Sequence, residues 1–482
     1  MNERPVRLAA DALLAVLLAA LAACRVGPDY RPPEVAADVA APFASMQATG
    51  QSAEIPPDPW WRLYDDPRLD GLVLEALQAN RTLAAADANF AAARAVLSAV
   101  HAERYPSTHL TAGALRGRDA LTDEILELGG HAPQTIWLYE DVFQAAYEID
   151  LFGRVHRSIE VAAANADAVG AARDAVRVVV AAEAARGYAA ICALGEQLGV
   201  ARHSYDVVAH EAEIARHRHE AGANSVFDVT RAEGLVDQVR ASIPVLEGQR
   251  RVALFALAAV LGRAPAAAPK DLDACMTPPR LVAVLPVGDG AALIQRRPDV
   301  RQAERRLAAA TAQIGVATAD LYPSIRLVGL YGGAASEVSA LDTNIGRTWG
   351  VGPSISWNFP NQALPRARVR QAKAQQAAAL AAFDGVVLTA LEEVEQALST
   401  YGAALANRDA LVGARDKTHS AYQIAHDQFA AGAVSTLDLL TTEQTLVTLD
   451  ASVAAADATL IQDQIAVFKA LGGGWRDASQ AR

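Results

Sequence analysis

The histidines on one predicted helix have the spacing that comes closest to a chemical site. His203, His210 and His217 recur every seven residues, and His219 lies nearby. Residues seven apart share a helix face but lie about 10 Å apart along the axis, which is too far for neighbouring pairs to hold one metal ion. We therefore interpret this stripe as a solvated or coiled-coil surface and predict no metal site.

The other polar residues form no catalytic motif. The sequence has no phosphate-cradling glycine loop, no nucleophile elbow and no HExxH pair. The glycines 472–474 follow a predicted helix and are interpreted as its end. We therefore expect neither enzyme activity nor a cofactor. We interpret the helical carboxylates as solvated or interface residues rather than as an acid/base pair. They are Glu392, Glu393 and Glu395.

The first cysteine follows a segment typical of secretion. Arg4 and Arg7 precede the apolar stretch 12–23, which is too short to span a membrane but suits a signal peptide. The stretch ends in Leu-Ala-Ala before Cys24, which is similar to the bacterial lipobox, where the cysteine becomes the lipidated first residue. We predict a signal peptide at 1–23 and a covalent lipid on Cys24. The alternative is a plain signal peptide with an accidental cysteine.

Two thiols then remain, Cys192 and Cys275. An oxidising periplasm permits a disulfide between them, and neither lies in a spacing typical of a metal site. Pairing is left open, and we favour two independent, packed cysteines.

Composition excludes one class of partner. The 43 basic and 55 acidic residues give a net charge of −12, and no basic cluster is interleaved with aromatics. A nucleic-acid partner is therefore not expected. Although 52% of residues are apolar, alanine carries much of this share, and no uninterrupted apolar run after residue 24 approaches the roughly 20 residues of a membrane helix.

An internal repeat organises the chain. Residues 221–262 align without gaps on residues 431–472, and eleven of these 42 positions are identical. In each copy a glycine that can end a helix is followed by a serine that can cap the next helix. The repeat therefore predicts two helix-to-helix turns. The matched pairs are Gly222 with Gly432, Ser225 with Ser435, and Asp228 with Asp438.

Long proline-free segments lead into both turns. Residues 154–221 and 366–430 lack proline, and about 65 helical residues would rise about 100 Å. Each segment is predicted to be one long helix, the alternative being two ordinary helices. The segments 225–261 and 435–471 would pack back as coiled-coil hairpins, with a kink at Pro244.

Strand patterns occur at 107–117, 134–150, 324–332 and 349–358. Their alternation of apolar and polar residues, and lengths of roughly ten residues, are typical of transmembrane strands, although a small periplasmic sheet has the same pattern. Because four strands cannot close a membrane barrel and an open edge cannot lie in lipid, several chains must contribute.

A set of motifs in a fixed order covers nearly all of residues 24–475. The chain resembles the outer-membrane factor lipoproteins, the NodT-like branch of the TolC-like efflux ducts. The motifs are VGPDY (26–30), the Trp60-Trp61 pair, DP (66–67), DLFGR (150–154), RRPDVRQAERRL (296–307), LYPS (321–324), VLTALEEVEQAL (387–398) and ALGGGW (470–475).

The resemblance implies a mainly α, internally duplicated, TolC-like fold with a β-barrel portion. Helical coiled-coil hairpins would form a periplasmic tunnel, and four transmembrane strands per chain would complete a trimeric 12-stranded barrel in the outer membrane. It also implies a passive efflux channel whose partners are a periplasmic adaptor and an inner-membrane pump, most often of the resistance-nodulation-division type. The alternative is a lipid-anchored helical scaffold or adaptor without a pore.

The resemblance assigns roles to the two turns. Adaptor hairpins would contact the tips at 222–228 and 432–438, and Leu437 and Asp438 match positions that line the closed periplasmic end. Thr441 occupies the position where the family has a second acidic residue. Alternatively, Asp438 only places a negative charge in the first turn of the returning helix, which would stabilise it by about 0.3–1 kcal/mol.

The expected domain organisation follows from the repeat. It consists of the signal peptide (1–23), a lipid-anchored segment (24–66), the first repeat (67–288), the second repeat (289–471) and a C-terminal tail (472–482).

Overall fold

A computed structural model describes residues 25–34, 39–46, 51–118, 124, 127–130, 132, 135–281 and 284–475. The predicted signal peptide and Cys24 lie outside these residues. Helices dominate the described chain, and one four-stranded sheet accompanies them. The helices of five or more residues are η1 (Trp60–Tyr64), α2 (Pro67–Ala79), α3 (Arg81–Ala102), α5 (Arg154–Glu220), α6 (Val226–Val260), η3 (Lys270–Ala274), α7 (Gly290–Arg296), α8 (Pro298–Ala319), α9 (Ala363–Ala430) and α10 (Thr436–Ala470).

The chain divides into two compact units, and each takes segments from both repeats. The sheet unit comprises Met1–Pro32, Ala91–Ala168 and Ala303–Phe383. The hairpin unit comprises Pro33–Phe90, Val169–Gln302 and Asp384–Arg482. The long helices α5 and α9 contribute to both units.

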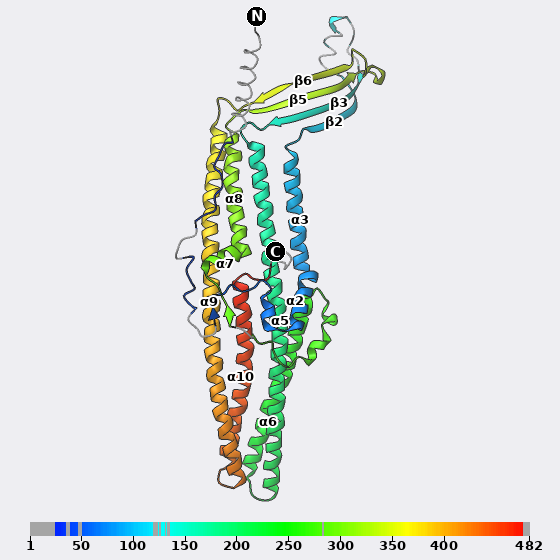
Figure 1. The fold of residues 1–482 in the computed structure, drawn as a ribbon. Helices are drawn as coiled ribbons and strands as arrows, with labels where there is room; N and C mark the ends of the chain where they lie inside the picture. The colour runs from blue at the N-terminus through cyan, green and yellow to red at the C-terminus, as the bar shows by residue number, and fades with distance from the viewer. Residues whose placement is uncertain are drawn as a thin grey trace. The chain divides into compact units, whose positions relative to one another are not determined.

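The sheet unit contains four antiparallel strands in the order β2-β3-β5-β6, which lie side by side in Figure 1. They begin and end within three residues of the expected positions. The strands are β2 (Ser107–Gly117), β3 (Ile136–Ile149), β5 (Ser324–Ala335) and β6 (Arg347–Ser356). Shorter elements of the fold are β1 (Gln51–Ser52), β4 (Leu285–Pro286), η2 (Pro265–Ala267) and η4 (Val338–Ala340).

Each proline-free segment is one uninterrupted helix. Helix α5 has 67 residues and α9 has 68, so the alternative of two ordinary helices is not what forms. The returning helices α6 and α10 have 35 residues each, and α6 continues through Pro244.

Both helix-to-helix turns are made as the repeat predicts. Gly222 and Gly432 have φ angles of 77° and 76°, a left-handed conformation that glycine adopts without a steric penalty. The amide of Ala223 donates to the carbonyl of Arg218 (2.8 Å) across the first turn, which is the bond of a Schellman motif. Ser225 and Ser435 then cap the next helices with the same backbone angles, φ −79° and ψ 157°.

Aromatic side chains close the core of the hairpin unit beside α10. Trp60 and Phe468 are each 1% exposed and stack with ring centroids 4.8 Å apart. Tyr64 packs edge-on against Phe468 and donates to Gln464. The Trp60-Trp61 motif therefore fixes the N-terminal segment to the last helix.

The two internal cysteines form a disulfide, so the expectation of independent cysteines is wrong. Cys192 of α5 is bonded to Cys275, with Cα atoms 4.8 Å apart. Arg250 of α6 donates to three carbonyl oxygens of the segment that follows α6, those of Leu272, Asp273 and Cys275, and the disulfide joins the same segment to α5. A separation of 83 residues hides this proximity from the sequence.

Two helices among the described residues are long and apolar enough to cross a membrane by length and composition, α3 and α5. Both are rich in alanine, and 67% of the apolar window of α5 is buried within the structure. This is weak evidence for a spanning helix, because buried helices pass the same test.

Candidate functional site

One face of the four-stranded sheet is apolar and exposed, and we call it the apolar face. The register aligns Leu110, Phe143, Tyr331 and Trp349 in one row across all four strands. Trp349 is 72% exposed and Val351, two residues on, is 73% exposed. A water-soluble sheet would cover such a surface, so this face is suited to lipid.

The opposite face of the sheet is mixed. It carries an ion-pair cluster in which Glu148 accepts from Arg154 (2.8 Å) and Arg326 (3.3 Å). Ser354 lies opposite Arg326 on the next strand, but Val328 and Leu330 also occupy this face. The clean polar face expected from the sequence is therefore interrupted by aliphatic residues.

Aromatic pairs lie at both ends of the strands. Trp137 and Tyr139 stack near the start of β3 (5.8 Å between centroids). At the other end, where the strands meet the helices, Phe152 stacks on Tyr322 (4.5 Å). Such rings are typical of the two interfaces of a membrane barrel. A third pair lies at this second end, Trp357 and Phe359 (4.7 Å).

The sheet has two open edges. Strands β2 and β6 each have one neighbour among the described residues. In lipid, every backbone amide and carbonyl must be hydrogen-bonded. A membrane position therefore requires further strands at both edges.

Residues 25–32 are fixed beside the second aromatic pair. The amide of Val26 donates to the carbonyl of Phe152 (3.3 Å), and Arg157 donates to Asp29 (2.8 Å). This hydrogen bond and the positive charge of Arg157 lower the pKa of Asp29. Tyr30 donates to Glu304 (2.5 Å). The VGPDY motif thus holds the chain just after Cys24 at the helix end of the sheet.

The predicted tip residues lie at the two turns of the hairpin unit. Asp228 and Ser225 form a complete capping box. At the second turn, the Ser435 hydroxyl donates to the Asp438 carboxylate (2.6 Å) and accepts from the Asp438 amide (3.2 Å). Asp438 therefore takes part in helix capping, and Leu437 beside it is 46% exposed.

One hydrogen bond joins the two returning helices near their turns. Arg231 of α6 donates to Thr441 of α10 (3.1 Å). Thr441 lies where the family resemblance implies a second acidic residue, and its hydroxyl accepts from the Arg231 cation.

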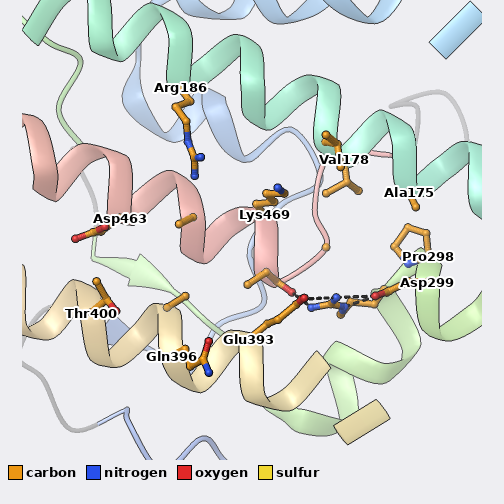
Figure 2. Close-up of a pocket in the computed structure, with 16 residues that line it drawn as sticks. Ala175, Val178, Arg186, Pro298, Asp299, Glu393, Gln396, Thr400, Asp463 and Lys469 are labelled. Carbon is orange, nitrogen blue, oxygen red and sulfur yellow. Dashed lines mark hydrogen bonds and ion pairs between the residues drawn. The ribbon is translucent and has the colours of Figure 1, made fainter. Parts of the chain in front are cut away.

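The cavity in Figure 2 is a pocket of about 460 Å³ between α5, α9 and α10, lined by both apolar and charged side chains. Arg297 lines this pocket and donates to Asp299 (2.6 Å) and Glu393 (2.6 Å). Burial raises the pKa of Asp299, but the hydrogen bonds and charge of Arg297 outweigh it and leave the pKa below its ordinary value. Arg186 extends from α5 toward α10. The pocket contains no nucleophile paired with a base.

The histidine stripe forms no shared site in the part of the chain that the structure describes. His203, His210, His217 and His219 are all exposed on α5. No group of three or more metal-ligating side chains able to hold an ion occurs within the part of the chain that the structure describes.

Known proteins match over nearly the whole chain. The family model described as "Outer membrane efflux protein" matches residues 72–263 and 291–473. Nodulation protein T of Rhizobium leguminosarum bv. viciae is 31% identical over 96% of this chain and 93% of its own length. Outer membrane protein OprJ of Pseudomonas aeruginosa is 30% identical, with 94% of each chain covered. The structure of the outer-membrane channel OprN has a TM-score of 0.85 and 34% identity, covering 94% of this chain and 100% of that one.

The apolar face, the aromatic pairs and the long helices define an outer-membrane channel with a periplasmic helical part. The chain belongs to the outer membrane efflux protein family. It is an outer-membrane component of an efflux system, and the similar protein OprN is an outer-membrane channel. The two separate family matches reflect the internal duplication.

Sequence reasoning placed the strands and turns but missed contacts between distant elements. The aromatic pairs had a signal, since each lies at a predicted strand end. Arg231 with Thr441 had none, because the two residues are 210 positions apart. For Cys192 and Cys275, which are 83 residues apart, the only signal was that an oxidising periplasm permits a disulfide.

Proposed function

We propose that three copies of this chain assemble into one 12-stranded outer-membrane barrel, through which small toxic compounds or drugs leave the cell passively. The observation that carries the proposal is the four-stranded sheet with an exposed apolar face and two open edges. Membrane barrels have at least about eight strands, so two copies of this four-stranded sheet would already supply enough strands. The choice of three copies comes from the family resemblance. Pairing of β6 with β2 of the next copy would remove both edges.

The helices would form the wall of a periplasmic duct with no catalytic step of its own. Transport energy would come from an inner-membrane pump, most often of the resistance-nodulation-division type, through a periplasmic adaptor. The exposed residues Val226 and Phe227 at the first turn, 63% and 68% exposed, support adaptor contact at the tips. The contact residues of this proposal are Gly222, Ser225, Asp228, Gly432 and Ser435.

A lipid on Cys24 would add an anchor at the inner interface of the membrane. Support comes from Val26, which is bonded beside the Phe152 and Tyr322 rings. A lipidated residue two positions earlier would lie near the level where such rings meet lipid headgroups. Leu437 and Asp438 would narrow the periplasmic end of the duct.

The test is to purify the full-length protein in detergent and insert it into planar bilayers. We expect trimers that resist dissociation in sodium dodecyl sulfate and stepwise ion conductance. A monomer that gives no conductance would instead indicate a lipid-anchored scaffold without a pore.

A further inference from the structure

Two glutamates occupy core positions of the helical hairpins. Glu443 of α10 is 1% exposed and Glu211 of α5 is 7% exposed. Leu440, Glu443 and Val447 are spaced by three and four residues, which places them on one helix face. Glu443 lies seven residues after Thr436, the first residue of α10, or about two turns from the helix start.

Apolar layers enclose this pair on both sides. Toward the turn, Ala212, Ala215, Ala232 and Leu440 form a buried cluster. Away from the turn, a second cluster contains Val208, Leu235 and Val239, with Val447 packed against it. The carboxylates therefore replace one hydrophobic layer of a coiled-coil interface, where polar residues reduce stability.

Among the described residues, no cation is bonded to the Glu443 carboxylate. Neither of its carboxylate oxygens has a hydrogen-bond partner among the described residues. Glu211 faces it from α5, and from α9 the Tyr422 hydroxyl bonds Glu211. The ring of His426, also on α9, comes within 3.9 Å of Glu211. On α6, Arg231 donates to Thr441.

The equivalent glutamate of the first repeat is exposed and ion-paired. Glu233, which aligns with Glu443, is 47% exposed at its side chain and bonds Arg216 at 3.0 Å. Arg216 aligns with His426, so the second repeat has a histidine where the first has a permanent cation. Glu211 aligns with Ala421. The buried pair is therefore a feature of one repeat and not a consequence of the duplication.

Two buried carboxylates without a cation cannot both be ionised at low cost. Burial, together with the charge of Glu211, raises the pKa of Glu443 to about 7. At acidic pH one proton on the pair removes the repulsion. Above this pKa, ionised Glu443 adds a charge to the apolar layer beside Glu211.

We propose that Glu211 and Glu443 form a proton-dependent contact between α5 and α10, which holds the two hairpins together when the pair is protonated and loosens them when the pair is ionised. The proposal goes beyond the conduction of solutes, and it depends on neither the barrel nor the pump.

The direction of the pH effect follows from the raised pKa. The packed state binds the proton more tightly than the open state, so packing is fully stable below the ordinary pKa of 4.5 and weakens as pH rises toward about 7. With a pKa of 4.5 for Glu443 in the open state and about 7 in the packed state, the equilibrium constant for local opening rises about tenfold between about pH 6 and about pH 8.5.

Hydrogen exchange of the purified full-length protein tests this. Exchange rates of amides 440–447, corrected for the pH dependence of intrinsic exchange, should rise about tenfold over that range in the natural protein. Glu443→Gln keeps the shape but cannot ionise, so its corrected rates should be independent of pH. Glu211→Gln removes only the like charge, so a reduced but measurable dependence should remain.

Two controls separate the pair from other titrating groups. Glu233→Gln changes the exposed equivalent in the first repeat and should retain the tenfold effect. His426→Asn removes the neighbouring imidazole and should also retain it. A pH dependence that survives in Glu443→Gln, or disappears in either control, overturns the proposal.

Discussion

Arg231 of α6 donates a hydrogen bond to Thr441 of α10 at 3.1 Å, and it joins the two returning helices about one and a half turns from their starts. In the first repeat the equivalent of Thr441 is Arg231 itself, because the two positions differ by the repeat offset of 210. The contact therefore links equivalent positions of the two repeats through unlike side chains.

Replacing Arg231 by alanine should loosen the tips, because an exposed hydrogen bond worth about 0.5–1.5 kcal/mol is lost. We expect a higher resting conductance in planar bilayers with the oligomer intact. Arg240→Ala is the matched control, since the ion pair that Arg240 forms among the described residues is with Asp237 of the same helix. Equal conductance changes in both variants would argue against a specific role for the contact.

The gate is tested at Leu437 and Asp438. If they line the constriction, Asp438→Asn should reduce cation preference and Leu437→Ala should raise resting conductance. The hydrogen bond between Ser435 and Asp438 (2.6 Å) supports a capping role as well. If only thermal stability falls in Asp438→Asn, by about 0.3–1 kcal/mol, capping is its sole role.

Membrane insertion of the sheet is tested on its two faces. Val351→Arg places a charge on the apolar face, at a cost of about 2–4 kcal/mol near the bilayer midplane for each chain. Ser354→Arg, on the opposite face, lies across from Arg326, and this like-charge pair should cost only about 0.2–1 kcal/mol. The yield of heat-resistant oligomer should therefore fall much further for Val351→Arg, and equal yields would contradict the assignment of faces.

Lipidation is tested by Cys24→Ala. Labelled palmitate should be incorporated by the natural protein and not by the variant, and signal processing should slow. Efflux should fall only partly, because the barrel would still hold the protein in the membrane. Unchanged labelling of the variant would exclude Cys24 as the lipid site.

The disulfide should stabilise the hairpin unit. Cys275→Ser should lower the free energy of unfolding by about 2–4 kcal/mol, measured by thermal denaturation. A reducing agent should lower the melting temperature of the natural protein and leave that of the variant unchanged. Peptide mapping without reduction should recover the segments around Cys192 and Cys275 as one cross-linked species.

The sequence by itself determined the elements that depend on local chemistry. Glycine followed by serine in each repeat specifies a turn, because one residue accepts a left-handed conformation and the other caps the next helix. Proline-free alanine-rich segments specify helices of 67 and 68 residues. Alternation over roughly ten residues specifies the strands. The order of the motifs was specific enough to indicate the family.

Tertiary structure alone decided the contacts between residues far apart in the chain. Cys192 of α5 is bonded to Cys275, whose carbonyl oxygen also accepts a hydrogen bond from Arg250 of α6, so residues of three distant segments meet there. Glu233 and Glu443 occupy equivalent sequence positions, yet one is solvated beside Arg216 and the other is buried opposite Glu211. Periodicity assigns a residue to a helix face, but the helix that covers that face, and hence the burial and charge state of the residue, depends on how distant segments pack.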